Sequence, residues 1–354
     1  MNEYGQNKAA TRRIALALAA AVVAASLLQP AQQAQAAQHG YKLIEQAIDV
    51  DGARSSLSAL NMDNTTYIAI RALNDAIGLT TDWDKASGTV TVTGRDRELA
   101  LNLQDGSANL NGQRIYGLPA VVRNNTTYVP FRFLLERMGY GVSYDSATKT
   151  IGIETIEENE LKISTARIQE SEKNKSLTIH YPQISGFANE AVQKKINETL
   201  KTDAELNAEV ARRTLSDSLG DGDFGYSVSF EGTYTVTYNA DGKLSLYVDY
   251  YTYSGGAHGS TARATYTFDL ATGKLLTLKD AAGGNERYVA IINDKIQSQI
   301  KARRLTLLNP FRTIEPNRDF FLKPSGIVVF FTEYEYTPYA AGMPEFEIPY
   351  SEFE

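Results

Sequence analysis

The pattern of hydrophobic and polar positions repeats once within the first half of the chain. Residues 64–90 align with residues 125–151 at a fixed offset of 61 positions and without a gap. So many matches at one offset indicate an internal duplication, and therefore one domain built from two copies of a single unit. The residues that recur are Asn64 as Asn125, Thr65 as Thr126, Thr66 as Thr127, Tyr67 as Tyr128, Arg71 as Arg132, Leu73 as Leu134, Gly78 as Gly139 and Asp84 as Asp145.

Each copy predicts the same run of elements. A hairpin turns at the Asp-Gly pair 51–52 or at the Asn-Gly pair 111–112, because these dipeptides favour the tight turns that join antiparallel strands. An extended segment, a helix and two short strands follow, and Gly139 stands where a left-handed cap is expected after the second helix. We therefore expect one α+β domain over residues 37–156. That second helix is indicated by apolar residues at spacings of three and four, namely Phe131, Leu134, Leu135 and Met138.

A second domain is predicted over residues 161–354, after a short acidic linker at 157–160. Its apolar positions alternate with polar ones in some segments, as in strands, and recur at helical spacing in others. This order predicts a second α+β unit, in which an antiparallel sheet packs against two helices. The expected strands are 162–179, as a hairpin with its turn at 172–175, then 226–238, 243–253, 261–269 and 326–332, and the expected helices are 187–200, with a polar continuation toward 215, and 286–303.

The beginning of the chain has the pattern of an export signal. An uncharged run at 14–28 follows three basic residues, Lys8, Arg12 and Arg13. Such a run spans roughly 22 Å as a helix, short of the roughly 30 Å of a hydrocarbon core, so a cleaved signal is favoured over a membrane anchor. We predict a signal peptide that ends at Ala36. The mature protein is then secreted, extracellular and associated with the cell wall, with no membrane contact after cleavage.

Composition and charge narrow the classes of partner. The 354 residues are 43% hydrophobic and 22% charged, which is a globular composition, and they include no cysteine. Disulfides, thiol nucleophiles and thiolate metal sites are thereby excluded, and an exported chain without disulfides suits a Gram-positive exterior. The formal net charge is −7, and removal of the signal region, which carries +2, lowers it to −9. Nucleic acid and anionic lipid are not expected as partners, whereas a cationic partner is favoured.

The second copy contains a motif made of Thr127, Tyr128, Val129, Pro130, Arg132, Gly139 and Asp145. This motif resembles the copper amine oxidase N-terminal-like domain, and the first copy departs from it with Ala69 in place of the proline. The oxidase chemistry belongs to a separate catalytic domain that needs three histidine ligands and a modified tyrosine. Beyond the export signal the chain offers only His39, His180 and His258, so neither a copper centre nor another cofactor is expected.

Residues that both copies keep are interpreted as structural. Arg71 and Arg132 are expected to tie each helix start to a neighbouring hairpin, with ligand contacts as the alternative. Tyr67 and Tyr128 are expected to be half-buried packing residues. Pro130 belongs to the same structural motif.

Two further stretches are distinctive in the second domain. Residues 253–259 read Tyr-Ser-Gly-Gly-Ala-His-Gly, and residues 336–346 read Tyr-Thr-Pro-Tyr-Ala-Ala-Gly-Met-Pro-Glu-Phe. Together with the helix pattern they resemble the extracytoplasmic domain of lysozyme-sensing anti-sigma factors of the RsiV type, a domain that also precedes the catalytic part of some peptidoglycan deacetylases. The resemblance covers residues 161–354. Because the sigma-binding segment, the internal transmembrane helix and the deacetylase catalytic domain have no counterpart here, neither complete activity is expected.

His258 is the first candidate for chemistry, because imidazole titrates near neutral pH. Without a second ligand or a nucleophile nearby in sequence, we interpret it as a hydrogen-bonded loop residue. Gly255, Gly256 and Gly259 then supply the positive φ angles that such a loop needs.

Two acidic groups are weaker candidates. The segment 217–223 lacks the alternating spacing and the closing glutamate of a calcium loop. Glu333 and Glu335 share one strand face, and we interpret them as solvated carboxylates rather than as an acid–base pair. No catalytic residue and no metal ligand is predicted.

The segment 334–346 is the predicted binding element. Rigid aromatic side chains anchor interfaces efficiently, and acidic neighbours suit a cationic partner. The resemblance implies that the corresponding loop is presented to lysozyme, a strongly basic enzyme. The alternative is that the tyrosines pack against the end of the sheet. The residues of interest are Tyr334, Tyr336 and Tyr339, stiffened by Pro338 and Pro344, beside Glu333, Glu335 and Glu345.

The sequence thus predicts a secreted, non-catalytic cell-envelope binding protein. Its C-terminal domain is expected to engage lysozyme, another cationic protein, or a wall component such as peptidoglycan. The repeat domain is expected to serve as a second adhesive or spacing module. Two other classes stay open: an architectural wall protein without a soluble ligand, and an enzyme that acts on peptidoglycan, which would need polar groups clustered in a pocket.

Overall fold

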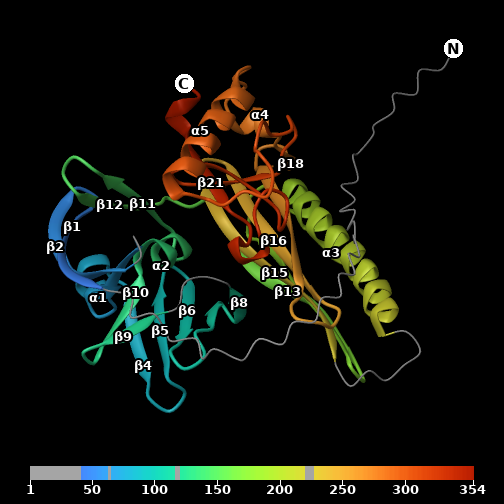
Figure 1. Cartoon of the computed structure of the whole chain (residues 1–354), viewed down its shortest axis with the longest axis horizontal. Coiled ribbons are helices and arrows are strands. Elements are labelled where there is room, and N and C mark those ends of the chain that lie inside the picture. The colour runs from blue at the N-terminus through green and yellow to red at the C-terminus, as the bar shows by residue number, and fades with distance from the viewer. Residues whose placement is uncertain (1–40, 63–64, 116–119, 220–226) are drawn as a thin grey trace. The chain divides into compact units, whose positions relative to one another are not determined.

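The computed structural model describes residues 41–62, 65–115, 120–219 and 227–354 (Figure 1). The predicted signal peptide at 1–36 and part of the acidic segment 217–223 lie outside the described residues. Gly40–Glu354 forms one compact unit, in which the repeat segment and the C-terminal segment have separate hydrophobic cores. Within the described ranges, no helix is both long and apolar enough to cross a membrane.

The described part of the repeat segment contains two sheets and two short helices. The larger sheet has the strand order β11 (Tyr140–Asp145), β12 (Thr150–Thr155), β1 (Lys42–Val50), β2 (Ala53–Met62), β3 (Thr65–Ala69), β10 (Thr126–Pro130) and β9 (Val121–Arg123). The smaller sheet has the order β4 (Thr80–Asp84), β5 (Thr89–Gly94), β6 (Arg97–Asn102), β7 (Ala108–Leu110) and β8 (Gln113–Ile115). The helices are α1 (Ala72–Ile77) and α2 (Phe131–Arg137).

In each sheet, the opening hairpin of one copy lies beside the closing hairpin of the other copy. The opening hairpin of the first copy, β1–β2, pairs through β1 with β12 of the second copy's closing hairpin, β11–β12, in parallel register. The first copy's closing hairpin, β4–β5, reaches the second copy's opening hairpin, β7–β8, through β6. The strands that carry Tyr67 and Tyr128, β3 and β10, pair with each other in antiparallel register. Each sheet therefore needs strands from both copies.

Helix α2 begins and ends where its sequence predicts. Its left-handed cap is Gly139, with φ of 85°, and Gly78 ends α1 in the same way with φ of 72°. Glycine is favoured at such positions because it has no Cβ to clash. The expected helix and its glycine cap are confirmed. The apolar residues that the periodicity placed on one face, Phe131, Leu134, Leu135 and Met138, are all at most 2% exposed.

A six-stranded sheet forms the first part of the C-terminal segment. Its order is β13 (Lys162–Glu172), β14 (Lys175–Ser185), β15 (Val228–Ala240), β16 (Lys243–Tyr253), β17 (Ser260–Asp269) and β18 (Lys274–Leu275). Every pair is antiparallel except β14–β15, which is parallel. The parallel pair arises because helix α3 (Glu190–Leu219) lies between these strands in the chain and carries it back across the sheet.

Helix α3 begins at Glu190, follows the predicted continuation toward 215 and ends at Leu219. The helix has 30 residues because small and apolar side chains continue at helical spacing to its last turns. The alanines of this stripe let the helix approach the sheet closely. The buried stripe is Val192, Ile196, Leu200, Ala204, Ala208, Ala211 and Leu215, each at most 6% exposed.

A three-stranded antiparallel sheet completes the fold, in the order β19 (Phe320–Lys323), β20 (Gly326–Phe330) and β21 (Glu345–Pro349). It packs with α4 (Leu278–Ala281) and α5 (Tyr288–Arg303) around a core rich in phenylalanine. The 3₁₀ turns are η1 (Tyr339–Ala341) and η2 (Tyr350–Glu352). The expected α+β class is confirmed, although β19 and β21 were not foreseen.

The side chain of Gln113 bonds to the backbone of β15 at a point where β14 no longer pairs with that strand. The two strands pair only as far as Ile179 opposite Gly232. Beyond that point the backbone of Tyr234 accepts a hydrogen bond from Gln113 Nε2 at 2.5 Å and donates one to Oε1 at 3.4 Å. Gln113 is only 4% exposed, and a buried amide needs hydrogen-bond partners. The backbone C=O and N–H of Tyr234, which β14 does not pair, are those partners.

A buried network of charges joins the sheets. Arg263 on β17 donates through Nε and Nη2 to both carboxylate oxygens of Asp249 on β16, at 2.7 and 2.9 Å, and through Nη1 to Glu345 on β21 at 2.8 Å. Lys323 on β19 lies 3.8 Å from Glu345 and 3.4 Å from Glu136 of α2. The side chains of Arg263 and Asp249 are 7% and 11% exposed. Strands distant in sequence are thus fixed by paired charges.

The guanidinium of Arg263 also lies 3.8 Å from the ring centroid of Tyr247. Burial alone would lower the pKa of Arg263, but the hydrogen bonds to Asp249 and the neighbouring negative charges raise it instead. The arginine therefore stays charged inside the protein.

Replacement of Asp249 by alanine should destabilise the protein strongly. The substitution leaves Arg263 buried without its bidentate partner, and loss of one member of a buried pair costs about 3–5 kcal/mol. Urea denaturation at neutral pH measures the change in the free energy of unfolding. Glu198→Ala is the control, because Glu198 pairs with Lys194 at 3.7 Å on an exposed helix face and should change stability by less than about 1 kcal/mol. Equal effects of the two substitutions would contradict the prediction.

Candidate functional site

The loop between β20 and β21 presents the candidate surface. It is closed at its base by a hydrogen bond from Phe331 N to Pro344 O at 3.0 Å. Turns inside it are held by bonds from Glu335 N to Thr332 O and from Gly342 N to Tyr339 O, at 3.2 and 2.8 Å. The loop therefore has a defined conformation that its own backbone hydrogen bonds hold.

Tyr334 lies at the tip of this loop in an unfavourable backbone conformation. Its φ is 63°, in the left-handed region where a bulky residue is uncommon, and its side chain is 53% exposed. Such strain persists only where the surroundings impose it, and it is enriched at binding sites. The conformation keeps a large aromatic ring in solvent.

Glu335 holds the loop from below. Its carboxylate accepts hydrogen bonds from Arg318 Nη1 and Nη2 at 2.5 and 2.6 Å, and from the backbone of Thr332 at 2.9 Å. Arg318 also donates to the carbonyl of Phe330. Burial by itself would raise the pKa of Glu335, but the bonds and the charge of Arg318 hold it below its usual value. Glu335 is an anchor, not the solvated carboxylate that the sequence predicted.

Tyr336 and Tyr339 face different environments. Tyr336 packs inward, with ring centroids 4.6 Å from Phe331 and 5.5 Å from Phe311. Pro338 precedes the turn η1, and Tyr339 begins it. The packing alternative therefore describes Tyr336, whereas Tyr339 belongs to the surface.

Three rings from two distant motifs form one stack. The ring of Tyr339 lies 3.8 Å from that of His258 at an interplanar angle of 18°, and 5.7 Å from that of Tyr334 at 28°. We call Tyr334, Tyr339 and His258 the aromatic surface. Partial burial and the nearby charge of Glu333 raise the pKa of Tyr339, so its hydroxyl stays protonated at neutral pH. The stack offers flat apolar faces with polar edges.

The glycine-rich loop holds His258 in this position. Gly255 and Gly256 have φ angles of 94° and 98°, and Tyr253 donates a hydrogen bond to the carbonyl of Gly256 at 3.0 Å. Gly259 does not have the positive φ that the sequence predicted. Glycine is required there for another reason, because a Cβ at position 259 would lie 2.3 Å from the carbonyl oxygen of Thr252. His258 Nδ1 lies 2.9 Å from the carbonyl oxygen of Gly259, and because that oxygen only accepts, the proton must be on Nδ1.

Glu333 connects the β20–β21 loop to the start of β17, just after the glycine-rich loop. Its Oε2 accepts a hydrogen bond from the backbone of Thr261 at 3.0 Å, whereas Glu335 turns to Arg318. The two carboxylates therefore serve separate contacts and do not form a pair. Among the described residues, no group of three or more histidine, aspartate or glutamate side chains is placed to hold a metal ion.

The remaining predicted residues lie apart from this surface. Glu345 belongs to the buried charge network with Arg263. Tyr67 and Tyr128 are 3% and 7% exposed and pack together beside Leu60, so they are more buried than expected. Pro130 ends β10 and caps α2.

The two repeated arginines differ in surroundings. Arg132 Nη1 donates to the carbonyl of Val142 at 2.7 Å and to Glu136 at 3.0 Å, which joins the start of α2 to the β11–β12 hairpin. Arg71 stands at the N-terminal end of α1 with its side chain exposed.

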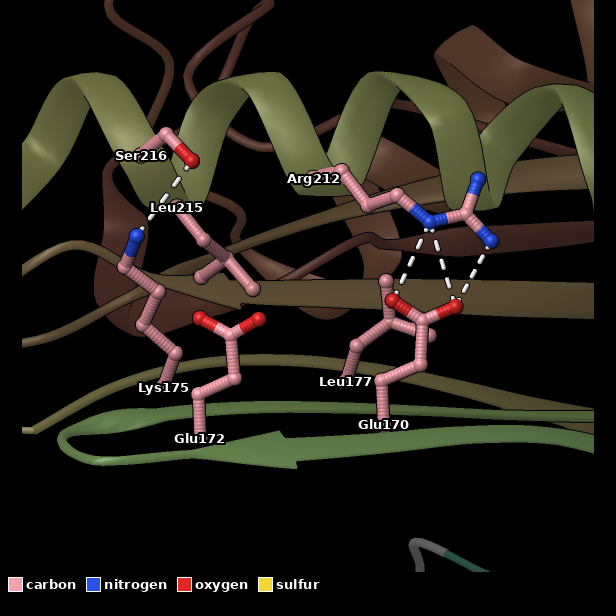
Figure 2. Close-up of a pocket in the computed structure, with 7 residues that line it drawn as sticks. All are labelled: Glu170, Glu172, Lys175, Leu177, Arg212, Leu215 and Ser216. Atoms are coloured by element: carbon pink, nitrogen blue, oxygen red, sulfur yellow. Dashed lines mark hydrogen bonds and ion pairs between the residues drawn. The ribbon is translucent and has the colours of Figure 1, made fainter.

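A separate cleft of about 170 Å³ lies between α3 and the tip of the β13–β14 hairpin (Figure 2). Arg212 Nη2 binds Glu170 at 2.7 Å and Lys175 lies 3.4 Å from Ser216, while Glu172 points toward the helix without a drawn partner. With two acidic and two basic side chains the cleft has no net charge. Its Glu170–Arg212 pair is about half exposed, so we assign it no ligand.

Comparison with known families gives three consecutive matches. Residues 49–153 match the copper amine oxidase N-terminal domain, residues 168–261 match the deacetylase PdaC family, and residues 280–351 match DUF3298, a family of unknown function. The domain architecture expected from the sequence is confirmed. None of the three models covers half of the chain.

The chain is also similar to individual proteins. The anti-sigma-V factor RsiV of Bacillus subtilis is 28% identical over 200 residues, which is 53% of this chain and 67% of that protein. Solved DUF3298 proteins from Bacteroides fragilis and Pseudomonas aeruginosa are each 18% identical and cover 55% of this chain and 93% of their own, with TM-scores of 0.43 and 0.41.

The Glu335–Arg318 pair should make stability depend on pH. The folded-state pKa of Glu335 lies below the ordinary value of 4.5, so its contribution is fully present above pH 4.5 and is lost as the pH falls through the folded-state pKa. Glu335→Gln should cost about 2 kcal/mol at neutral pH, and the difference from the parent protein should shrink on acidification.

Urea denaturation at several pH values measures this difference. The control is Glu286→Gln, because Glu286 is 83% exposed in its pair with Lys279 and its substitution should leave stability nearly unchanged. A cost of Glu335→Gln that stays constant from neutral to acidic pH would show that Glu335 acts only by packing.

Proposed function

We propose that this protein is an extracytoplasmic binding protein whose C-terminal segment captures a cationic protein, with lysozyme as the expected partner. The single observation that carries the proposal is the aromatic surface. It joins the loops around His258 and Tyr339, which lie far apart in sequence, into one exposed stack held from below by Arg318 and Glu335. Interfaces concentrate their binding energy in such rigid, pre-ordered aromatic residues.

Charge supports a cationic partner. The chain has a formal net charge of −7, and Glu333 lies beside the aromatic surface. Negative potential speeds the approach of a basic protein and disfavours acidic ones. Lysozyme is strongly basic, and the resemblance to lysozyme-sensing anti-sigma factors makes it the first partner to test.

The proposed location rests on the similarity to the anti-sigma-V factor RsiV. The two motifs at 253–259 and 336–346 resemble the extracytoplasmic domain of anti-sigma factors of this type. We infer secretion and residence near the cell wall, with peptidoglycan as a second ligand class. A non-catalytic role fits the aromatic surface, which contains one histidine and, beside it, one carboxylate engaged by the backbone of Thr261.

Truncation of the aromatic surface should weaken lysozyme binding. The purified protein is titrated with a c-type lysozyme at physiological salt, beside Tyr334→Ala and Tyr339→Ala. Each substitution should weaken the affinity at least about tenfold, which corresponds to about 1.4 kcal/mol, because it removes a central aromatic anchor. Binding by the parent protein should also weaken as salt rises.

The matched control is Tyr144→Ala, because Tyr144 is 55% exposed on β11 of the repeat segment, much as Tyr334 is on the loop. It should leave the affinity unchanged. Absence of binding at tens of micromolar lysozyme would reject lysozyme as the partner and make wall glycan the next ligand to test. Equal losses in all three variants would reject the aromatic surface as the site.

A further inference from the structure

His258 differs from the two tyrosines of the aromatic surface because its ring can change charge near neutral pH. Histidine is the side-chain type that ordinarily gains or loses a proton between about pH 5 and pH 8. The residue is exposed, so water reaches the ring and can deliver a proton. Neither the family matches nor the proposed capture of a cationic protein gives this proton a role.

The added proton goes to one defined atom of the ring. Nδ1 of His258 lies 2.9 Å from the carbonyl oxygen of Gly259 and donates a hydrogen bond to it. A neutral imidazole carries one proton, so Nε2 takes up the second one and the ring becomes a cation. Nδ1 is a donor in both states, and the bond to Gly259 is therefore kept. Proton uptake changes the charge of the surface without breaking the contact that holds the ring.

The ring of Tyr339 favours the charged form of His258. The two ring centroids lie 3.8 Å apart, and the rings are nearly parallel, at 18°. A cation within about 6 Å of the face of an aromatic ring is attracted by that ring, and a neutral group loses this attraction. The free protein therefore stabilises a proton on His258 through the stack.

Titratable groups from two elements border the stack. Tyrosines ordinarily lose a proton at about pH 10 and carboxylates at about pH 4. Partial burial and the charge of Glu333 raise the pKa of Tyr339. Histidine is thus the side-chain type of this surface whose charge ordinarily changes between about pH 5 and pH 8. The bordering groups are Glu333, Tyr334 and Tyr339 from the β20–β21 loop and Tyr251 and Tyr253 from β16.

A proton on His258 opposes the approach of a cation. With His258 neutral, a partner meets the negative charge of Glu333 beside Tyr339. With His258 protonated, a positive charge offsets that carboxylate, and like charges at an interface repel each other. We propose that proton uptake by His258 weakens the binding of a cationic protein to the aromatic surface, so that acidification releases the partner. This inference rests on the proposed function and adds its regulation.

Thermodynamic linkage fixes the sign and the size of the effect. If the proton disfavours the partner, the partner disfavours the proton by the same factor, and binding expels the proton. One group that titrates can change Kd at most about tenfold per pH unit. For a c-type lysozyme at constant physiological salt, Kd of the parent protein should rise about fivefold to tenfold from about pH 7.5 to about pH 5.5.

His258→Gln is the variant that tests the assignment. Glutamine can still donate an amide hydrogen bond to the carbonyl of Gly259, but it cannot gain a charge. The ratio of its Kd values at the two pH values should be no more than about twofold, which also measures the contribution of lysozyme's own titrating groups. His180→Gln is the matched control, because His180 is a half-buried histidine on β14, outside the aromatic surface, and burial lowers its pKa. This variant should keep the ratio of the parent protein.

A second measurement needs no lysozyme. The ring signals of His258 are followed by NMR as a function of pH in the whole protein and in Tyr339→Leu. Removal of the aromatic face should move the midpoint of the titration toward acid by about 0.5 pH, because the charged form loses its attraction to the ring.

The outcomes separate the two proposals. Equal Kd ratios for the parent protein and His258→Gln would overturn the inference and leave the lysozyme contact in place. An unchanged midpoint in Tyr339→Leu would overturn the role of the stack. Absence of lysozyme binding at both pH values would reject the proposed function and its regulation together.

Discussion

The paired charges around Arg263 are the constraint on which the C-terminal segment depends. One guanidinium is bonded to Asp249 on the neighbouring strand and to Glu345 on a strand of another sheet, while Lys323 extends the network to Glu136 of the repeat segment. Buried charges tolerate little movement because each must keep its partner. The network therefore fixes where β21 begins, and with it one end of the loop that carries Tyr334 and Tyr339.

The aromatic surface is built on that fixed frame by two different devices. Gly255 and Gly256 adopt positive φ angles, and Gly259 leaves no room for a Cβ. The resulting backbone conformation stacks the ring of His258 against that of Tyr339. Arg318 holds the second loop through Glu335, so Tyr334 stays exposed in a strained conformation. Pre-ordering of this kind lowers the entropy that a binding event would otherwise lose.

Much of the fold could be predicted because its signals are local. Turn dipeptides, the spacing of Phe131 to Met138 and the glycine cap at 139 all act within a few residues, and strand β16 occupies the range that was expected. Strands β19 and β21 were missed because they are short and their pairing depends on residues far away in sequence. The exchange of hairpins between the copies likewise could not be read from either copy alone.

The candidate site shows the same division. Tyr334 and Tyr339 could be selected from composition, since tyrosines beside prolines and acids are typical of interfaces. Their stacking on His258 depends on two loops meeting in space, and the anchoring role of Arg318 has no local signal at all. Glu335 and Tyr336 were chosen for the surface because sequence shows residue type but not which way a side chain turns.

The exchanged hairpins also govern the order in which the repeat segment folds. Strand β1 near the start of the segment pairs with β12 at its end, with Ala47 opposite Thr150 and Val50 opposite Ile153. During synthesis the first copy emerges with an open sheet edge that its own strands cannot cover. Contacts so distant in sequence slow folding and leave apolar strands open to aggregation until they close. Because of the duplication, neither copy can complete its sheet until the other copy has been synthesised and has folded against it.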